Sequence, residues 1–277
     1  RYRVPGAEWL GFDESHSHAP RLFLHLPQRD VDRATLAAAT QVVLVDDELS
    51  TGNTFVNLVA ALRRVMPALS RVHIATIADF TGDRRWLLSE RMGIPCSIGG
   101  LLRGAWCFEH RDDAGPETLL TNSAAQCSAG HEVQLEDAGY GRLGRTTCVS
   151  LPKGLVERLA GEPVEGATLV LGTGEFMHAA FALGRALEAR GVDVRVQSTT
   201  RSPILLWGAV GHILAVPDPY GEAVQNYLYN VRPGQYARVL ICHETAPNDP
   251  LMQLATILGA RLIHFTSDDH AEEIPVC

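Results

Sequence analysis

Apolar runs and helical patterns alternate along the first half of the chain. Residues 42–45 form a short β-branched apolar run that ends in two aspartates, and apolar residues then recur at helical spacing through residues 55–62. An apolar run over residues 72–77 and a helical pattern over residues 86–92 repeat this order. Continuous apolar runs are typical of strands that are buried on both faces of a parallel sheet. The order of elements therefore predicts an α/β fold.

The same alternation returns in the second half. Apolar runs predict strands at residues 167–171, 192–197, 211–216, 239–242 and 261–265, and helical spacing predicts helices that end near Gly191 and cover residues 251–258. Between the halves, from about residue 97 to 144, the period is lost and turn residues dominate. We interpret this stretch as an irregular connection with some strand content.

The two halves also resemble each other. Residues 42–48 align without gaps on residues 238–244, and each segment has a glutamate third after its apolar run. One interpretation is a degenerate duplication in which the second copy lost its polar loop residues. The alternative is that any two strand–helix units look alike, and the pattern favours neither.

Composition and charge narrow the class of protein. The 277 residues include 46% hydrophobic residues, enough for a buried core, and have a formal net charge of −8. An acidic chain without a large basic face disfavours nucleic acid as a partner. No apolar run approaches 18 residues, and the first residues lack a secretory signal, so we expect a cytoplasmic protein with no membrane partner.

A polar loop follows the first apolar run. Its residues are Asp46, Asp47, Glu48, Ser50, Thr51, Gly52, Asn53 and Thr54. Backbone N–H groups and the helix dipole favour an anion where a strand end leads into a helix, so hydroxyls and a glycine there predict a phosphate-binding loop. The adjacent carboxylates would repel phosphate, and they suit sugar hydroxyls or a magnesium ion held through water.

The sequence VVLVDDELSTGNT at residues 42–54 resembles the phosphoribosyl-pyrophosphate loop of type I phosphoribosyltransferases. The resemblance implies that Asp46 and Asp47 hold the ribose hydroxyls, contacting Mg²⁺ only indirectly, and that residues 50–54 hold the 5′-phosphate. Glu48 is then a candidate base near the acceptor. An acidic strand end followed by a capped helix is the structural alternative.

Three further segments make the resemblance to a family more specific: residues 12–19, 172–175 and 200–203. With them, nearly the whole chain resembles the orotate phosphoribosyltransferase-like proteins with a C-terminal TRSP domain, which are associated with bacterial tellurium-resistance and stress gene clusters. The resemblance implies two Rossmann-like, phosphoribosyltransferase-type domains at residues 1–145 and 146–277, and a role in making or modifying a nucleotide-like metabolite.

Residues 1–27 are expected to form the flexible hairpin that closes over phosphoribosyl pyrophosphate in this family and excludes water. Its candidate pyrophosphate contacts are Arg1, Arg3, His16 and His18, with solvated loop histidines as the alternative. The family has a pyrophosphate loop and a first core strand ahead of this hairpin, whereas this chain opens at the hairpin. We therefore expect either further residues upstream or a first half that is incomplete as a catalyst.

Two loops of the second half predict another anion pocket. Its candidate residues are Gly172, Thr173, Gly174, Glu175, Thr200, Arg201, Ser202, Asp218, Tyr220 and Glu244. Right-handed crossovers bring the carboxyl ends of neighbouring strands to one edge, so Arg201 should lie near Gly174 and bind a nucleotide or a phosphorylated intermediate. Ordinary turn chemistry is the alternative.

Cys242 and His243 are adjacent on a predicted strand end. Adjacent side chains on a strand point to opposite faces, which argues against a thiol nucleophile that is activated by this histidine.

The leading hypothesis is a Mg²⁺-dependent glycosyltransferase that binds phosphoribosyl pyrophosphate or a nucleotide monophosphate and transfers the phosphoribosyl group to or from a nitrogenous base. The alternative is a non-catalytic nucleotide-binding regulatory protein, because a fold can keep a phosphate loop without the reaction. A hydrolase of nucleotides ranks third. We also consider a homodimer.

Overall fold

The computed structural model describes residues 6–13, 21–105, 107, 109, 140, 148–220 and 225–275. Its contacts divide the chain into two units, Arg1–Pro116 and Glu117–Cys277. The domain boundary that the sequence places near residue 145 lies among residues outside this description, so that boundary stays a prediction.

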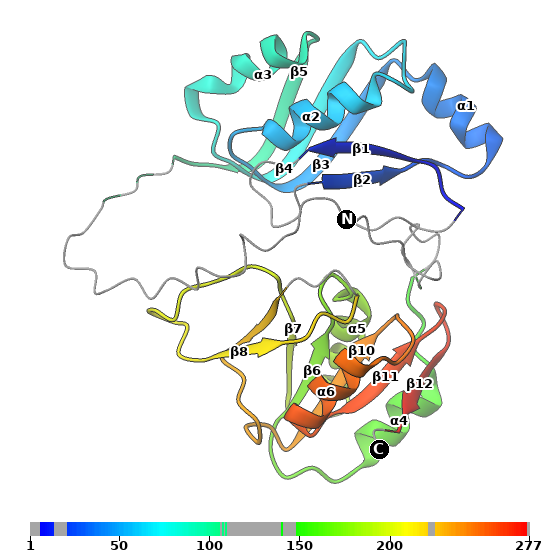
Figure 1. The fold of residues 1–277 in the computed structure, drawn as a ribbon, viewed down its shortest axis with the longest axis vertical. Helices are drawn as coiled ribbons and strands as arrows, with labels where there is room; N and C mark the ends of the chain where they lie inside the picture. Colours follow the sequence, from blue (N-terminus) through cyan, green and yellow to red (C-terminus); the bar gives the residue numbers. More distant parts are fainter. Residues whose placement is uncertain are drawn as a thin grey trace. The chain divides into compact units, whose positions relative to one another are not determined.

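The first unit is built on three parallel strands, β3 (Gln41–Leu49), β4 (Arg71–Asp79) and β5 (Cys96–Arg103), in the spatial order β3-β4-β5. The connections contain α2 (Asn53–Leu62) after β3, and η1 (Gly82–Arg84) and α3 (Arg85–Met92) after β4. Both connections advance in the same direction across the sheet. Right-handed crossovers therefore place both helices on one face (Figure 1).

The two faces of this sheet differ in exposure. Leu44 and Ile74 belong to a buried cluster with side chains of α2 and α3. The strand positions that alternate with them are exposed, with Val43 at 61%, Val45 at 76% and Ile77 at 54%. Parallel sheets usually have both faces covered, so an exposed apolar face is unusual for such a sheet.

Two further strands and a helix precede the sheet. Strands β1 (Trp9–Asp13) and β2 (Arg21–His25) form an antiparallel pair, followed by α1 (Asp30–Ala38), which the sequence analysis did not predict. Leu10 joins the buried cluster of the first unit. The Arg64 guanidinium at the end of α2 donates a hydrogen bond to the Gly11 carbonyl at 3.0 Å. The predicted hairpin is thus present as a strand pair that is attached to the body of the first unit.

Strand β5 confirms the strand content expected in the connection from about residue 97, but it is more regular than the sequence pattern suggests. Its register with β4 continues from Cys96, opposite Val72, to Arg103, opposite Asp79. The glycines at 99 and 100 and the exposed leucines at 101 and 102 remove the apolar alternation by which a strand is recognised. Backbone pairing with β4 nevertheless keeps this segment extended.

The second unit contains a five-stranded mixed sheet in the order β12-β11-β10-β6-β7. The strands are β6 (Thr168–Gly172), β7 (Val194–Ser198), β10 (Arg238–His243), β11 (Arg261–Phe265) and the antiparallel edge strand β12 (Ala271–Ile274). The helices are α4 (Lys153–Gly161), α5 (His178–Glu188) and α6 (Asp249–Leu258). A separate antiparallel pair, β8 (Ile213–Val216) and β9 (Asn226–Tyr229), completes the unit.

Both faces of the second sheet are covered. Val170 and Leu240 pack with α4 and α5 in one buried cluster. Leu169 and Ile241, the alternating positions, pack with α6 and the β8–β9 pair in another. Strand β6, which lies between β10 and β7, is buried at every residue, as its continuous apolar run predicts.

The aligned segments of the two halves have different places in their sheets. β3 is an edge strand of a three-stranded parallel sheet, whereas β10 lies between β6 and β11 in a mixed sheet. The α/β class is confirmed, but the proposed duplication of a Rossmann-like domain is not.

Candidate functional site

A pocket of about 250 Å³ lies where β3 ends and α2 begins. One short stretch of the chain supplies its walls: Asp46, Glu48, Leu49, Ser50, Thr51, Gly52, Thr54 and Phe55. These include every residue that was predicted for the loop except Asp47 and Asn53. The predicted loop therefore forms a concave surface at the carboxyl edge of a parallel sheet, where α/β folds bind ligands.

The two aspartates at the end of β3 have different surroundings. Asp46 lines the pocket and Asp47 does not, which agrees with the opposite directions of adjacent strand side chains. Asp46 Oδ1 accepts a hydrogen bond from the Asp47 amide at 3.0 Å. The Thr76 hydroxyl on β4 donates to the Asp47 carbonyl at 3.0 Å. The carboxylates that face the pocket are therefore those of Asp46 and Glu48.

Gly52 makes the turn from the loop into α2. Its backbone is left-handed, with φ 72° and ψ 10°, a conformation that side chains disfavour. A Cβ at this position would lie 2.5 Å from Leu88 Cδ2 on α3. As the N-cap residue of α2, Gly52 supplies no side-chain acceptor to the first-turn amides. The helix start is therefore compatible with an anion, because those amides lack carbonyl partners within the helix.

Arg91 on α3 holds the loop from its other side. Its guanidinium donates to the Thr51 carbonyl at 3.1 Å and to the Asn53 side-chain oxygen at 2.6 Å. Together with Leu88 it makes α3 the support of the loop between β3 and α2. Sequence analysis missed Arg91 because the contact joins residues about forty positions apart, and no local pattern marks it.

Asp79 is an acidic residue at the same sheet edge that sequence analysis also missed. It is 2% exposed and lies at the end of β4, where its Oδ1 accepts hydrogen bonds from the Thr81 hydroxyl at 2.6 Å and the Thr81 amide at 3.0 Å. Burial opposes its ionisation, but the bonds from Thr81 and the charge of Arg85 outweigh burial and lower the pKa of Asp79. Its partners indicate that this carboxylate holds the loop after β4 in place.

The remaining candidates of the first site, Arg1, Arg3, His16 and His18, lie outside the described residues. Their predicted contacts with pyrophosphate therefore stay predictions.

The predicted loops of the second unit meet at the carboxyl edge of its sheet. The Gly174 amide donates to the Thr199 hydroxyl at 2.8 Å, which joins the loop after β6 to the loop after β7. The connections from β6 and β10 leave in opposite directions across the sheet, since β7 and β11 lie on opposite sides of them. This is a topological switch point, the usual ligand position in open α/β sheets.

Two donors of the predicted anion pocket, the Gly174 amide and the Arg201 guanidinium, are bonded to the protein itself. The Phe176 and Met177 amides donate at 2.9 Å to the Thr173 and Glu175 carbonyls. Arg201, whose side chain is 6% exposed, lies 3.3 Å from an Asp218 carboxylate oxygen. The charge of Arg201 is therefore balanced by a buried carboxylate, and the anion pocket expected at the Gly172–Glu175 loop stays a prediction.

The other candidates of the second unit extend this polar network. The Tyr220 hydroxyl lies 3.0 Å from the Thr173 carbonyl and 3.2 Å from a Glu244 carboxylate oxygen. Thr200 exchanges backbone hydrogen bonds with Tyr227 of β9, at 2.9 and 2.7 Å. The Tyr229 hydroxyl, also on β9, donates to the Ser202 carbonyl at 2.6 Å. The Thr-Arg-Ser-Pro segment is thus attached along its length to the β8–β9 region.

Cys242 and His243 are not a catalytic pair. Cys242 is fully buried in the core, and burial raises the pKa of its thiol far above the usual range. His243 is also fully buried, and its ring stacks on His264 with the centroids 4.9 Å apart. The His243 Nδ1–H donates to the Thr245 carbonyl at 2.8 Å, and Nε2 has no hydrogen-bond partner. The opposite directions expected for these two side chains are consistent with these surroundings.

Among the described residues, no group of three or more histidine, cysteine, aspartate or glutamate side chains could hold a metal ion. A magnesium ion at the first pocket would therefore need ligand or water oxygens beside Asp46 and Glu48, which is how Mg²⁺ commonly binds with phosphorylated substrates. No helix within the described ranges is long and apolar enough to cross a membrane.

Two family models match the chain. A family described as phosphoribosyl transferase matches residues 1–105. A domain described as the TRSP domain C-terminal to that transferase matches residues 145–258. No curated protein matches the chain.

Gly52→Ala should destabilise the first unit more than Gly82→Ala. Both glycines have positive φ values, 72° and 56°, but a Cβ at Gly82 meets no atom within 4 Å. Backbone strain should cost about 1–2 kcal/mol at each site. The contact with Leu88 should add roughly 1–3 kcal/mol at Gly52 alone. Urea unfolding of the two variants measures this difference, and equal losses would show that Leu88 does not constrain the turn.

Stability of the second unit should fall in mild acid because of His243. Burial lowers the pKa of His243 to about 4, and the neighbouring His264 adds to this effect, so the unfolded chain binds the proton at higher pH than the folded protein. The contribution of neutral His243 to the free energy of unfolding is fully present above about pH 6.5. About 3 kcal/mol of it is lost as the pH falls towards 4. Between pH 6.5 and 4 the melting temperature of the wild type should fall more steeply with decreasing pH than that of His243→Leu. An equal dependence of the melting temperature on pH in the two proteins would contradict the assignment.

Proposed function

We propose that this chain, which belongs to the phosphoribosyl transferase family with a TRSP domain after the transferase domain, binds phosphoribosyl pyrophosphate in the pocket after β3. In the proposed reaction it transfers the phosphoribosyl group to a nitrogenous base and releases pyrophosphate. The observation that supports this most strongly is the pocket itself, in which two carboxylates and a hydroxyl-rich loop converge at the start of α2.

The 5′-phosphate is assigned to the loop of residues 50–54. Ser50, Thr51 and Thr54 line the pocket and offer hydroxyl donors, and the start of α2 adds backbone amides and the positive end of the helix dipole. To bind the 5′-phosphate in a fixed position, the loop needs a defined shape before the ligand arrives. Leu88 and Arg91 provide it, because they restrict the turn at Gly52 and hold both sides of the loop.

The ribose is assigned to Asp46. A carboxylate accepts hydrogen bonds from vicinal hydroxyls, and Asp46 is the aspartate of the pair that lines the pocket. In the proposed step the bond from the anomeric carbon to the pyrophosphate oxygen breaks and a bond to the base nitrogen forms. Glu48, which also lines the pocket, is the proposed acceptor of the proton that the base loses.

A magnesium ion fits this donor set through Asp46 and Glu48 together with ligand oxygens or water. When bound, it would neutralise charge on the pyrophosphate leaving group. From the resemblance to proteins of tellurium-resistance and stress clusters, we further propose that the product is a nucleotide-like metabolite. The acceptor base is left open, so the assay must survey bases.

The assay incubates the full chain with phosphoribosyl pyrophosphate, magnesium and a panel of nitrogenous bases, and measures pyrophosphate release. We expect release with at least one base, and a loss of about tenfold or more in kcat/KM for Asp46→Asn, the cost of one charged hydrogen bond. Asp47→Asn is the matched control, because Asp47 does not line the pocket, and it should retain most of the activity.

Two results would oppose the proposal. Equal losses in both aspartate variants would remove the assignment of the ribose to Asp46. Saturable binding of phosphoribosyl pyrophosphate without pyrophosphate release for any base would favour a non-catalytic nucleotide-binding protein instead.

A further inference from the structure

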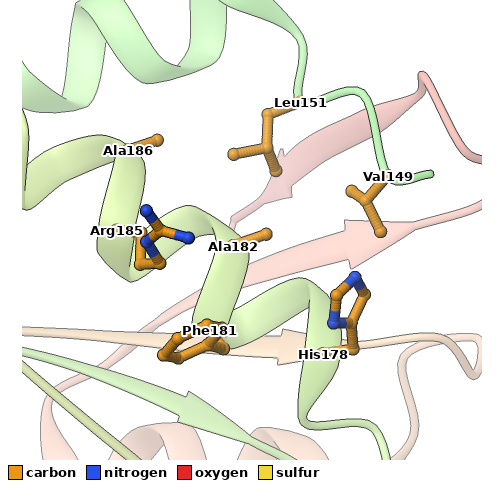
Figure 2. Close-up of a pocket in the computed structure, with 7 residues that line it drawn as sticks. All are labelled: Val149, Leu151, His178, Phe181, Ala182, Arg185 and Ala186. Atoms are coloured by element: carbon orange, nitrogen blue, oxygen red, sulfur yellow. The ribbon is translucent and has the colours of Figure 1, made fainter.

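A second pocket, a shallow cavity of about 400 Å³ that is open to solvent, lies beside α5 in the second unit. Figure 2 shows its lining, which consists of Val149, Leu151, His178, Phe181, Ala182, Arg185 and Ala186. A volume of this size is within the range of small-molecule sites. The cavity is outside the predicted loops, and nothing in the proposed reaction uses it.

The walls of this α5 cavity are apolar. Leu183 and Leu187 point into the core of the unit, whereas Ala182 and Ala186, one helical turn apart, face the cavity. Their small side chains leave a depression between Phe181 and Leu151 (Figure 2). Phe181 remains 51% exposed beside it, so an apolar ligand body would cover a surface that is otherwise in water.

The polar side chains among the described residues that line the cavity are His178 and Arg185. His178 and Arg185 are two helical turns apart on α5, about 10 Å by helix rise. Within the described ranges, neither side chain has a hydrogen-bond or ion-pair partner, whereas Arg201, Arg238 and Arg261 of the same unit are paired with carboxylates. The Arg185 guanidinium carbon lies 5.9 Å from the centroid of the Phe181 ring.

The charge of the cavity is opposite to that of the chain. Among the described residues that line the cavity there is no carboxylate, although the protein has a net charge of −8. Because Arg185 is charged at any physiological pH and is unpaired there, it favours an anionic group of a ligand. The described part of the lining contains no serine, threonine, asparagine or acidic residue, so it offers no side-chain oxygen to accept hydrogen bonds from sugar hydroxyls. A sugar phosphate therefore fits less well than an apolar anion.

We propose that the α5 cavity binds a small carboxylate with an apolar body. The carboxylate pairs with Arg185, and the body lies over Ala182 against Leu151 and Phe181, towards His178. The proposal does not rest on phosphoribosyl transfer, because the cavity shares no residue with the pocket after β3.

Octanoate is a suitable probe, with octanamide as its uncharged counterpart and acetate as the head group alone. Titration of the full chain by calorimetry should show saturable octanoate binding that is at least tenfold tighter than binding of octanamide or acetate. Equal binding of octanoate and octanamide would overturn the role of the anion. Equal binding of octanoate and acetate would overturn the role of the apolar body.

Variants test the location. Arg185→Gln should weaken octanoate binding by about tenfold or more, which corresponds to a charged hydrogen bond. Arg232→Gln is the matched control, because Arg232 is an exposed arginine of the same unit outside the cavity lining. Ala182→Leu should abolish binding by filling the depression, with circular dichroism to check that the variant folds. Wild-type affinity in Arg185→Gln, or an equal loss in Arg232→Gln, would overturn the proposal.

Discussion

The left-handed turn at Gly52 is the constraint on which the first pocket depends. The loop must leave β3, reverse direction and start α2 within a few residues, and only glycine does so at a positive φ while Leu88 occupies the space of a side chain. Arg91 then bonds the loop on both sides of this turn. The loop backbone is therefore held in shape before any ligand binds, so binding should carry only a small entropic cost of ordering it.

The second unit shows the opposite use of similar loops. There the Gly174 amide, the Arg201 guanidinium and the Tyr220 hydroxyl are bonded to Thr199, Asp218 and Thr173. Such a network fixes the loops at the topological switch point of the sheet. It also occupies the Gly174 amide and the Arg201 guanidinium, which were expected to bind an anion. The Thr-Arg-Ser-Pro motif is thus attached to β9 in this structure, and two further basic side chains of the unit, His178 and Arg185, lie on α5.

Sequence pattern predicted the elements with strong apolar runs and missed those without them. The segments β3, α2, β4 and β6 follow directly from buried apolar residues at strand or helix spacing. Strand β5 contains two glycines and exposed leucines, and only its pairing with β4 makes it a strand. The short helix α1 has no buried residue, so its sequence shows no clear apolar face. In each case the missing information is tertiary contact.

The candidate sites also contain features that the sequence predicts and features that only tertiary contacts determine. The pocket loop was predictable because its residues are contiguous in the sequence. The different surroundings of Asp46 and Asp47 follow from strand geometry. The support by Leu88 and Arg91 follows from the packing of α3 against the loop. In the second unit the meeting of the two loops follows from topology. The pairing of Arg201 with Asp218 depends on side-chain packing that spacing does not encode.

The most direct test of the account is a backbone amide NMR titration of the full chain with ribose 5-phosphate. The account predicts saturable shifts that are largest at residues 50–54, with smaller changes at Gly174, whose amide already donates to the Thr199 hydroxyl. Absence of saturable shifts at residues 50–54, or their concentration in the loops of the second unit, would contradict it.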